Sequence, residues 1–457
     1  MWDTPRPDRI TCPAPRLITD GKRIFCPAGS RASLSHRHRR GAGAAGPDPP
    51  DGLTAEEPVN SQNGTDRAQR PYDIVLFGAT GFVGALTAEY LARHAPQGCR
   101  WALAGRSLDK LEHLREQLAV IDPACAALPL VEADASDAGS LRELAESTRV
   151  VATTVGPYVW YGEGLVAACA DAGTDYVDLT GEPEFVDLMY VRHDARARET
   201  GARLVHACGF DSAPHDLGVY FTVRQLPEGV PLTVDGFVRS NAMFSGGTLA
   251  SALNAMGRPR ESLRAARERR LHEPRLVGRR ARAPLGGPHF SRETGTWALP
   301  LPTIDPQIVA RSARALERYG PDFRYRHYAG VKTLPMALAG PAALGAGFAL
   351  AQVPAARQWL MHRYAPGDGP SAKRRAESWF SVRFVGEGGG RRVLTEVTGG
   401  DPGYDETAKI LAESAMCLVA DALPKTSGQV TPVVAMGDAL LTRLEGAGIR
   451  FRVAHTR

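Results

Sequence analysis

The sequence predicts an α/β fold in which a doubly wound parallel sheet is followed by a second, α+β domain. Two observations lead to this prediction. Short apolar runs alternate with helical segments from residue 71 onward, and the pattern changes after about residue 226. A chain of 457 residues, 43% of them hydrophobic, is long enough for two such domains. We therefore predict an extension at 1–70, a sheet domain at 71–226 and a second domain at 227–457.

Residues 1–70 show no sustained period of 2 or 3.6 residues, and they contain clusters of Pro, Gly, Ser and Arg. Such a composition cannot bury enough apolar surface to offset the entropy cost of ordering, so we expect a disordered extension. A reading frame that starts too early would give the same pattern. In either case, the segment should be dispensable for folding.

The sheet domain is expected to contain six strands, each a short apolar run of the kind that is buried on both faces of a parallel sheet. The runs are Tyr72–Phe77, Trp101–Ala104, Ala127–Glu132, Arg149–Val155, Asp175–Leu179 and Ala202–Cys208. Helices are expected between them at Gly81–His94, Ser107–Val120, Ser136–Ser147, Gly164–Ala172 and Glu184–Thr200. Ser107 suits an N-cap, and Gly173 suits the position that ends a helix. Because crossovers between parallel strands are right-handed, such a series forms a doubly wound sheet.

The second domain is predicted from alternating strands with helices between and after them. The strands are expected at Pro231–Ser240, Trp379–Val385 and Arg392–Thr398, with the last two joined by a turn at Gly386–Gly390. This pattern indicates an antiparallel arrangement. A long helix is expected at Gly403–Ala422, and the C-terminal helices could pack back onto the sheet domain.

A glycine-rich loop, Gly78-Ala-Thr-Gly-Phe-Val-Gly84, directly follows the first strand and opens the first helix. In a Rossmann domain the first glycine permits a tight turn, the second lets the backbone approach a pyrophosphate, and the third allows close packing of helix and strand. The spacing is GxxGxxG, which alone would also fit a purely structural turn. The strand before it and the helix after it favour a dinucleotide site, with expected contacts from Gly78, Thr80, Gly81, Phe82, Val83 and Gly84.

The end of the second strand favours NADPH over NADH. An acidic residue there would bind the ribose 2′-hydroxyl and repel a 2′-phosphate, but this sequence has Gly105. Arg106 and Ser107 follow it and offer a guanidinium and a hydroxyl group to a phosphate. Asp134, after the third strand, could either contact the adenine or cap the next helix.

These motifs together resemble the saccharopine dehydrogenase-like family, and within it the trans-acting enoyl reductases. The resemblance covers residues 71–457 and depends on Gly78–Gly84, Ala104–Arg106, Val155–Tyr158, Asp178–Glu182, Gly209–Gly218, Gly428–Pro432 and Gly446–Val453. His215 is a departure, since relatives carry a small polar residue there. The resemblance implies an NADPH-dependent reductase of a polyketide or lipid pathway that acts on the carbon–carbon double bond of an enoyl thioester. The substrate would be held on an acyl carrier protein.

Two other functions fit the same cofactor motif. One is a non-catalytic NADPH-binding scaffold attached to a membrane or lipid surface, and the other is a ketone or imine reductase. Enoyl reduction needs a donor to the thioester carbonyl and a proton for the substrate carbon next to it. The sequence does not identify that acid.

The candidate catalytic residues follow the fourth and sixth strands. Gly156 and Pro157 would shape a turn against the cofactor, and Tyr158 is either a hydrogen-bond donor to the substrate carbonyl or a packed lid. His215 is either a proton donor or a histidine capped at a helix start, in a predicted cluster with His206, Asp211 and Asp216. Glu182 could orient this neighbourhood or bind solvent.

Composition bounds the remaining possibilities. A net charge of +5 does not indicate nucleic acid as a partner, and seven cysteines without a CxxC pair indicate a reducing, cytoplasmic setting without a metal site. Arg258–Arg282 contains ten arginines and three glutamates, and is either a solvated helix face or a dock for an acidic carrier protein or anionic lipid. Thr333–Ala356 carries no charge, so we expect either a buried helix or a peripheral membrane contact, used together with the arginine stretch.

Overall fold

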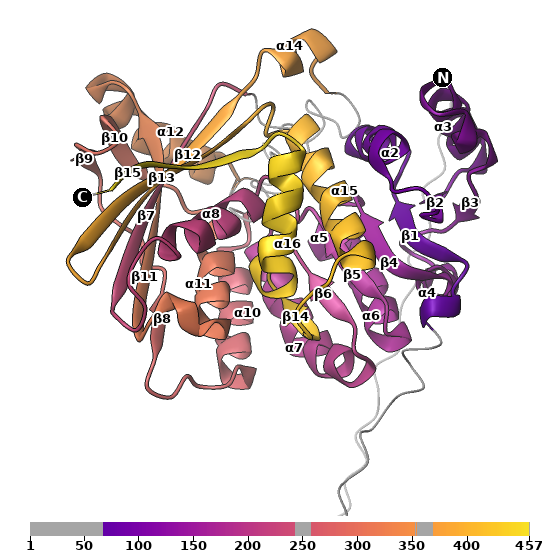
Figure 1. Ribbon diagram of the computed structural model, residues 1–457, viewed down its shortest axis with the longest axis horizontal. Coiled ribbons are helices and arrows are strands. Elements are labelled where there is room, and N and C mark those ends of the chain that lie inside the picture. The colour runs from indigo at the N-terminus through magenta and orange to yellow at the C-terminus, as the bar shows by residue number, and fades with distance from the viewer. Residues whose placement is uncertain (1–66, 243–256, 352, 354–368, 457) are drawn as a thin grey trace, which may run out of the picture. The chain divides into compact units, whose positions relative to one another are not determined.

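The computed structural model describes residues 67–242, 257–351, 353 and 369–456 (Figure 1). Most of the predicted extension therefore lies outside the described residues. Its last four residues do not behave as expected, because Arg70 is buried and its guanidinium donates a 2.7 Å hydrogen bond to the carbonyl of Thr148. The prediction of a disordered segment as far as residue 70 is thus wrong for 67–70, which pack at the amino end of the first sheet.

The first sheet has seven parallel strands in the order β14-β6-β5-β4-β1-β2-β3. They are β1 (Tyr72–Phe77), β2 (Trp101–Gly105), β3 (Leu130–Glu132), β4 (Thr148–Thr153), β5 (Asp175–Asp178), β6 (Arg203–Val205) and β14 (Gly428–Val430). The helices of this region are α2 (Phe82–His94), α3 (Leu108–Ile121), α4 (Ala138–Ser147), α5 (Tyr158–Tyr161), α6 (Glu163–Ala172) and α7 (Pro183–Thr200). This order, which reverses on either side of β1, confirms the doubly wound parallel sheet.

Strands β3 and β6 are shorter than predicted by at least three residues, and one strand of this sheet was not predicted. The segment Pro123–Ala127 forms a 3-10 helix, so β3 begins only at Leu130. Ala207 has a positive φ of 61°, which takes the chain out of the strand after Val205. The seventh strand, β14, comes from residues far beyond 226 and pairs with β6.

The second sheet has eight strands in the order β15-β13-β12-β7-β11-β10-β9, with β8 also paired to β11. They are β7 (Leu232–Ser240), β8 (Arg280–Arg282), β9 (His289–Ser291), β10 (Thr296–Pro300), β11 (Asp322–Val331), β12 (Phe380–Gly388), β13 (Arg391–Gly399) and β15 (Arg450–Thr456). The expected antiparallel pairs β7–β12 and β12–β13 are present, but β7 and β11 are parallel, so the sheet is mixed. The turn is also shorter than predicted, because only Gly389 and Gly390 separate β12 from β13.

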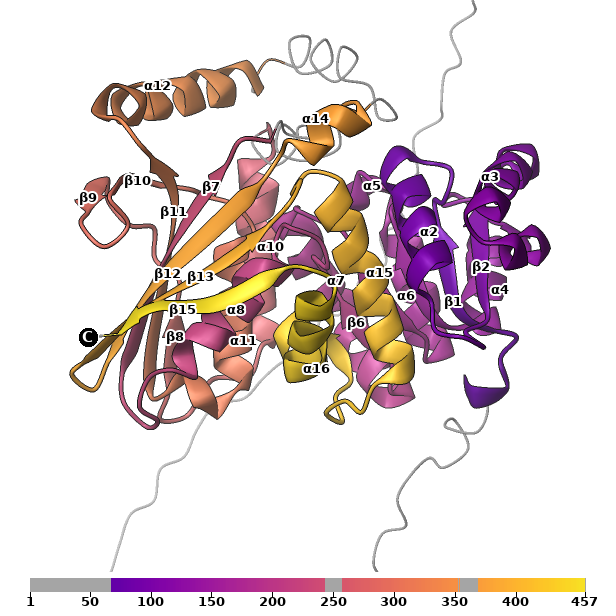
Figure 2. The ribbon, with the colours of Figure 1, turned by 45° about the horizontal axis from the view of Figure 1, so that its top comes forward.

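The remaining helices are α8 (Ala213–Val223), α10 (Pro259–His272), α11 (Asp305–Ala315), α12 (Leu334–Ala351), α14 (Ala372–Ala376), α15 (Asp405–Ala420) and α16 (Pro432–Gly446), with a 3-10 turn at Glu317–Tyr319. Helix α8 joins the two sheets, because it follows β6 and packs under β7, β12 and β13. A Cβ on Gly218 of this helix would lie 2.3 Å from the ring of Phe384, so the helix and the sheet touch closely. Figures 1 and 2 show α15 and α16 returning to the first sheet, where α15 contacts α2 and β4.

Candidate functional site

The glycine loop has the geometry of a phosphate cradle. Gly78 directly follows β1 and has a φ of +86°, and the amide of Gly81 donates to its carbonyl at 3.0 Å. A Cβ on Gly84 would lie 2.1 Å from the oxygen of Gly78, so only glycine permits this contact between loop and helix. Helix α2 has no side-chain cap and no acidic residue in its first turn, so its positive end is free to receive a pyrophosphate.

The 2′-phosphate subsite predicted from the sequence lies at the end of β2. Gly105 is the last residue of this strand, Arg106 is exposed, and Ser107 occupies the N-cap of α3 without making a cap hydrogen bond. The carboxylate of Asp134 accepts hydrogen bonds from the amide and hydroxyl of Ser136, which lower its pKa, with a further contribution from the charge of Arg106. Helix α4 is capped by Asp137 instead, so the expectation that Asp134 caps it is wrong.

The loop after β4 lies against the glycine loop. A Cβ on Gly78 would lie 2.7 Å from a methyl group of Val155, and the Gly156–Pro157 peptide bond is cis. Glu182 holds the loop, because its carboxylate accepts the amides of Tyr158 at 3.1 Å and Val159 at 2.8 Å. Glu182 thus orients the loop after β4 and not the predicted neighbourhood of His215.

Tyr158 is not a donor to substrate in this structure. Its hydroxyl is in the buried core, where it donates to the carbonyl of Thr153 and accepts the amide of Leu179, both at 3.1 Å. Because a phenol has only one proton to donate, none remains for a thioester carbonyl. The catalytic role considered for Tyr158 is therefore wrong, and the residue packs the loop onto the sheet.

The predicted cluster around the end of β6 divides into separate groups. His206 contacts Asp178 at 2.6 Å, and the same carboxyl group accepts the hydroxyl of Tyr176. Asp216 turns away toward the start of α16, where it accepts the amide of Val433 at 3.1 Å. Asp211 remains near His215 and, on its other side, faces Gly181, whose Cβ would lie 3.9 Å from its carboxylate.

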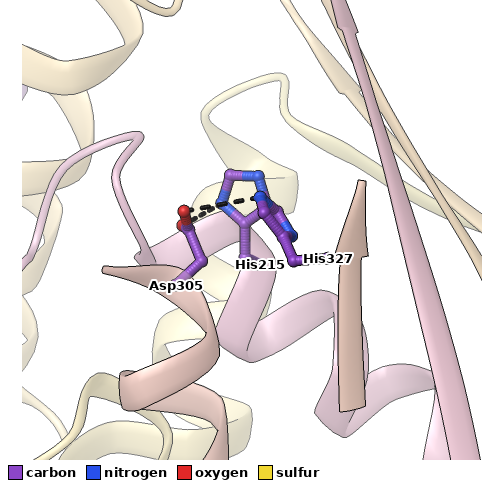
Figure 3. Close-up of side chains that lie close together, drawn as sticks. All are labelled: His215, Asp305 and His327. Carbon is purple, nitrogen blue, oxygen red and sulfur yellow. Dashed lines mark ion pairs between the residues drawn. The ribbon is translucent and has the colours of Figure 1, made fainter. Parts of the chain in front are cut away.

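His215 lies in a buried group with Asp305 and His327, which come from α11 and β11 (Figure 3). Its Nδ1 lies 2.9 Å from the carboxylate of Asp305 and 3.1 Å from the carbonyl oxygen of Phe210. His327 places its Nε2 3.5 Å from the other oxygen of Asp305, and its Nδ1 2.7 Å from the hydroxyl of Tyr325. All three side chains are almost fully inaccessible to solvent, and the Nε2 of His215 has no protein hydrogen-bond partner.

The electrostatics of this group favour an ion pair between His215 and Asp305. Burial alone would lower the pKa of His215, but the carboxylates of Asp305 and Asp211 and the carbonyl of Phe210 raise it. Burial opposes ionisation of Asp305, yet the two imidazoles and the Thr303 hydroxyl hold its pKa well below the usual range. Burial lowers the pKa of His327 to about 4, so this ring is neutral.

Two further carboxyl groups near the pair hold their protons more tightly than usual. Burial and the neighbouring charge of Asp305 raise the pKa of Asp211 to about 6. Burial raises the pKa of Asp216 to about 7, although hydrogen bonds from Ser312, Val433 and Thr431 act in the opposite direction. The cluster can therefore hold and release protons near neutral pH.

The same three side chains could in principle hold a metal ion, since each offers a ligand atom and these atoms lie within 4.8 Å of one another. The Nδ1 of His215, however, faces a carbonyl oxygen that can only accept a hydrogen bond, so this nitrogen carries a proton. A metal could therefore bind His215 only through Nε2. Because Nδ1 lies 2.9 Å from the carboxylate of Asp305, we interpret the group as a proton-holding cluster.

Sequence reasoning found His215 but missed Asp305 and His327. A signal for His327 was present, because Phe323, Tyr325 and His327 are every second residue of β11 and all three are buried, whereas the arginines between them are not. That period of 2 predicts a strand with a histidine on its inner face. For Asp305, at the first position of a helix, the sequence has no comparable signal.

The two surface segments also differ from expectation. Helix α10 packs against α7, where Arg269 is buried and paired with Asp187 at 2.9 Å, and Arg258 is paired with Glu184 at 2.8 Å. The arginine stretch is thus only partly a solvated face. Helix α12 is not the buried helix that was one of its two predicted alternatives, since Met336 and Leu338 are 57% and 70% exposed. None of the described helices is long and apolar enough to cross a membrane.

The Tyr-x-x-x-Lys spacing of short-chain dehydrogenases occurs once in the sequence, at Tyr328 and Lys332. Tyr328 lies on β11 in the second sheet, where its buried ring stacks on Phe237 with a centroid distance of 5.4 Å. Lys332 is exposed just beyond the end of that strand. Tyr328 and Lys332 therefore do not belong to the cofactor site that is formed by the loops of the first sheet.

Comparison with known proteins gives matches over nearly the whole chain. Residues 74–205 match the family described as the saccharopine dehydrogenase NADP binding domain. A trans-acting enoyl reductase of Mycobacterium bovis (strain BCG / Pasteur 1173P2) is 38% identical over 415 residues, which are 84% of this chain and 97% of that protein. A Mycobacterium tuberculosis (strain ATCC 25618 / H37Rv) protein, provisionally given the same name, is 40% identical over 412 residues, covering 83% and 97%. Saccharopine dehydrogenase (L-Glu forming) of Saccharomyces cerevisiae aligns over 84% of this chain and 100% of its own, with 12% identity and a TM-score of 0.48.

Proposed function

Because this chain belongs to the saccharopine dehydrogenase-like family, in the branch of the trans-acting enoyl reductases, we propose that it reduces an enoyl thioester with NADPH. The chain is an oxidoreductase with a nicotinamide dinucleotide-binding domain. The observation that supports the proposal most is that the glycine loop follows β1 and that His215 of the proton-holding cluster lies on the helix that follows β6. Both strands belong to the same parallel sheet, and such sheets bind their ligands beyond the carboxyl ends of the strands.

The residues of the cradle fit the proposed cofactor. The free amides at the start of α2 would bind the pyrophosphate, and Gly84 lets the helix approach closely enough to present them. Arg106 would pair with a 2′-phosphate, for which Gly105 leaves room and removes the competing carboxylate. When bound, NADPH supplies the hydride for the substrate Cβ.

The proposed proton donor is His215. Its Nδ1 is fixed by Asp305 and the carbonyl of Phe210, which leaves Nε2 to give a proton to the substrate Cα. Hydride at Cβ and proton at Cα together give the saturated thioester, and the histidine is left neutral. Asp211, with its raised pKa, lies beside it and can return a proton from solvent. The substrate would be an acyl chain carried on an acyl carrier protein.

The function is tested by following NADPH oxidation with a panel of thioesters. We expect consumption with enoyl thioesters and none with the matched β-keto thioesters or an imine. A protein that binds NADPH but oxidises it with no member of the panel would be a scaffold instead. Saturated product must also be identified by mass, since only that shows that the double bond was reduced.

The donor is tested with His215→Gln, compared with His113→Gln, a change at an exposed histidine on α3. We expect His215→Gln to lower kcat by at least 100-fold, in keeping with the usual effect of losing a general acid, and His113→Gln to leave it unchanged. His215→Ser is the informative second variant, because it removes the imidazole and leaves a small polar side chain at this position. Normal turnover by His215→Ser would transfer the donor role to Asp211.

A further inference from the structure

Helix α12 leaves an apolar surface uncovered. Its sequence contains no charged residue and no Ser, Thr, Asn or Gln over 18 residues. Leu334, Met336, Leu338 and Leu350 are exposed, and only Ala337 is buried among the side chains of this helix that the structure describes. Among the described elements, α12 contacts β10 and β11.

A helix that is apolar on every side needs apolar surroundings on every side. Such helices are found inside large cores or in contact with lipid, whereas a surface helix normally carries a polar face toward water. Exposed apolar patches on a protein of ordinary composition mark contacts with a partner or a membrane. The exposed side chains of α12 therefore form a candidate contact surface.

Cationic and aromatic side chains lie near α12, at the end of the second sheet where β11 ends and β12 begins. Helix α12 follows β11 directly, and α14 leads into β12, two strands away across β7. Ala329 of β11 pairs with Val238 of β7, and Val238 pairs with Val382 of β12. The last residues of β11 and the first residues of β12 therefore lie at the same end of the strands. Figure 2 shows α12 and α14 beyond this edge of the sheet.

The charge at this edge is positive. Lys332 precedes α12, Lys373 and Arg374 are exposed on α14, and Arg239 lies over the ring of Trp379 at 5.7 Å. Residues 332–333 and 369–379 are the described segments next to α12 and α14, and Glu377 is the one acidic residue in them. Tryptophan and lysine beside an apolar helix are typical of the boundary between acyl chains and headgroups.

We propose that α12, with Lys332, Lys373, Arg374 and Trp379, is a docking surface for a membrane that contains anionic lipid. The helix would lie in the interface, since none of the described helices is long and apolar enough to cross a bilayer. A lipid surface fits better than a protein, because protein interfaces carry a hydrogen bond about every 100–200 Å² and α12 offers no side chain that can make one.

The docking surface lies next to the cofactor loop. Arg375 of α14 stacks over the ring of Phe82, the first residue of α2, at 5.4 Å. A Cβ on Gly369, just before α14, would lie 2.3 Å from the same ring. Acyl chains dissolved in the lipid would therefore meet the protein beside its nucleotide site.

The proposal is tested by flotation of the full chain with vesicles of phosphatidylcholine alone or with phosphatidylglycerol. We expect binding only to anionic vesicles, weakened by high salt because screening acts on the cationic residues. The double variant Met336→Glu/Leu338→Glu should lose about tenfold or more in affinity. Lys373→Glu/Arg374→Glu should bind more weakly and lose the dependence on salt.

The matched control is Leu271→Glu/Val277→Glu, two exposed apolar positions on and after α10, which should bind as the unchanged protein does. The proposal is overturned if the unchanged protein does not bind anionic vesicles at low salt. Equal binding by Met336→Glu/Leu338→Glu would also overturn it. So would conversion of a dimer to a monomer by this variant without vesicles, since α12 would then be covered by a second copy.

Discussion

Substitution of Gly84 by alanine tests the close contact on which the nucleotide site depends. The added Cβ would lie 2.1 Å from the carbonyl oxygen of Gly78 and 2.9 Å from two backbone carbons of Ala79. All three atoms are backbone, so no side chain can rotate away, and the helix must move from the strand by about 1 Å. Overpacking of a core usually costs about 1–3 kcal/mol, and we expect the upper end of this range.

The matched control is Gly81→Ala in the same loop. Its Cβ would lie 3.3 Å from the same carbonyl oxygen, and its φ of −74° suits any residue. We expect urea denaturation to show a loss of about 3 kcal/mol for Gly84→Ala and less than about 1 kcal/mol for Gly81→Ala. NADPH affinity should fall in both variants, because the second glycine lets the pyrophosphate approach the backbone.

A Gly84→Ala protein that unfolds at the same urea concentration as the unchanged chain would show that stability does not depend on the contact between loop and helix. An equal loss of stability in Gly81→Ala and Gly84→Ala would also contradict the prediction. In that case the loop would need glycine for its backbone conformation and not for the space between helix and strand.

Three further predictions follow from contacts of single residues. Arg106→Ala should weaken NADPH binding by about 1.5–3 kcal/mol and leave NADH binding unchanged, which titration with each cofactor would measure. Equal affinity of the unchanged protein for NADPH and NADH would contradict this prediction. Removal of residues 1–66 should leave the melting temperature nearly unchanged. Arg70→Ala should lower it, because the buried carbonyl of Thr148 loses its 2.7 Å donor and keeps only the hydroxyl of Thr174 at 3.4 Å. Asp305→Asn should cost about 3–5 kcal/mol at pH 5, since it leaves a buried imidazolium unpaired, and less at pH 9. This pH dependence follows from the two shifted pKa values. The raised pKa of His215 contributes folding stability that is present below about pH 6.5 and is lost as the pH rises. The lowered pKa of Asp305 contributes folding stability that is present above about pH 4. A destabilisation equal at both pH values would show that the pair is not ionised.

The local sequence determined the first sheet and its cofactor loop. Strand β1 runs over Tyr72–Phe77 as predicted, and Gly173 closes α6 in a left-handed conformation with a φ of 69°. These features depend on a few neighbouring residues, through alternation of apolar runs, capping groups and the freedom of glycine. Such signals are short-range, so they can be recognised without knowing what packs against them.

Only the tertiary structure decided what lies beside what. Strand β14 enters the first sheet from residue 428, and Asp305 and His327 reach His215 from positions 90 and 112 residues later in the chain. The hydroxyl of Tyr158 is in the core because a carbonyl and an amide from two strands meet there. These neighbours are set by the packing of one layer on another, which minimises exposed apolar surface over the whole chain and leaves no local period. The sequence therefore determined the type of fold and the cofactor loop, and the packing between the two sheets determined the acid–base cluster.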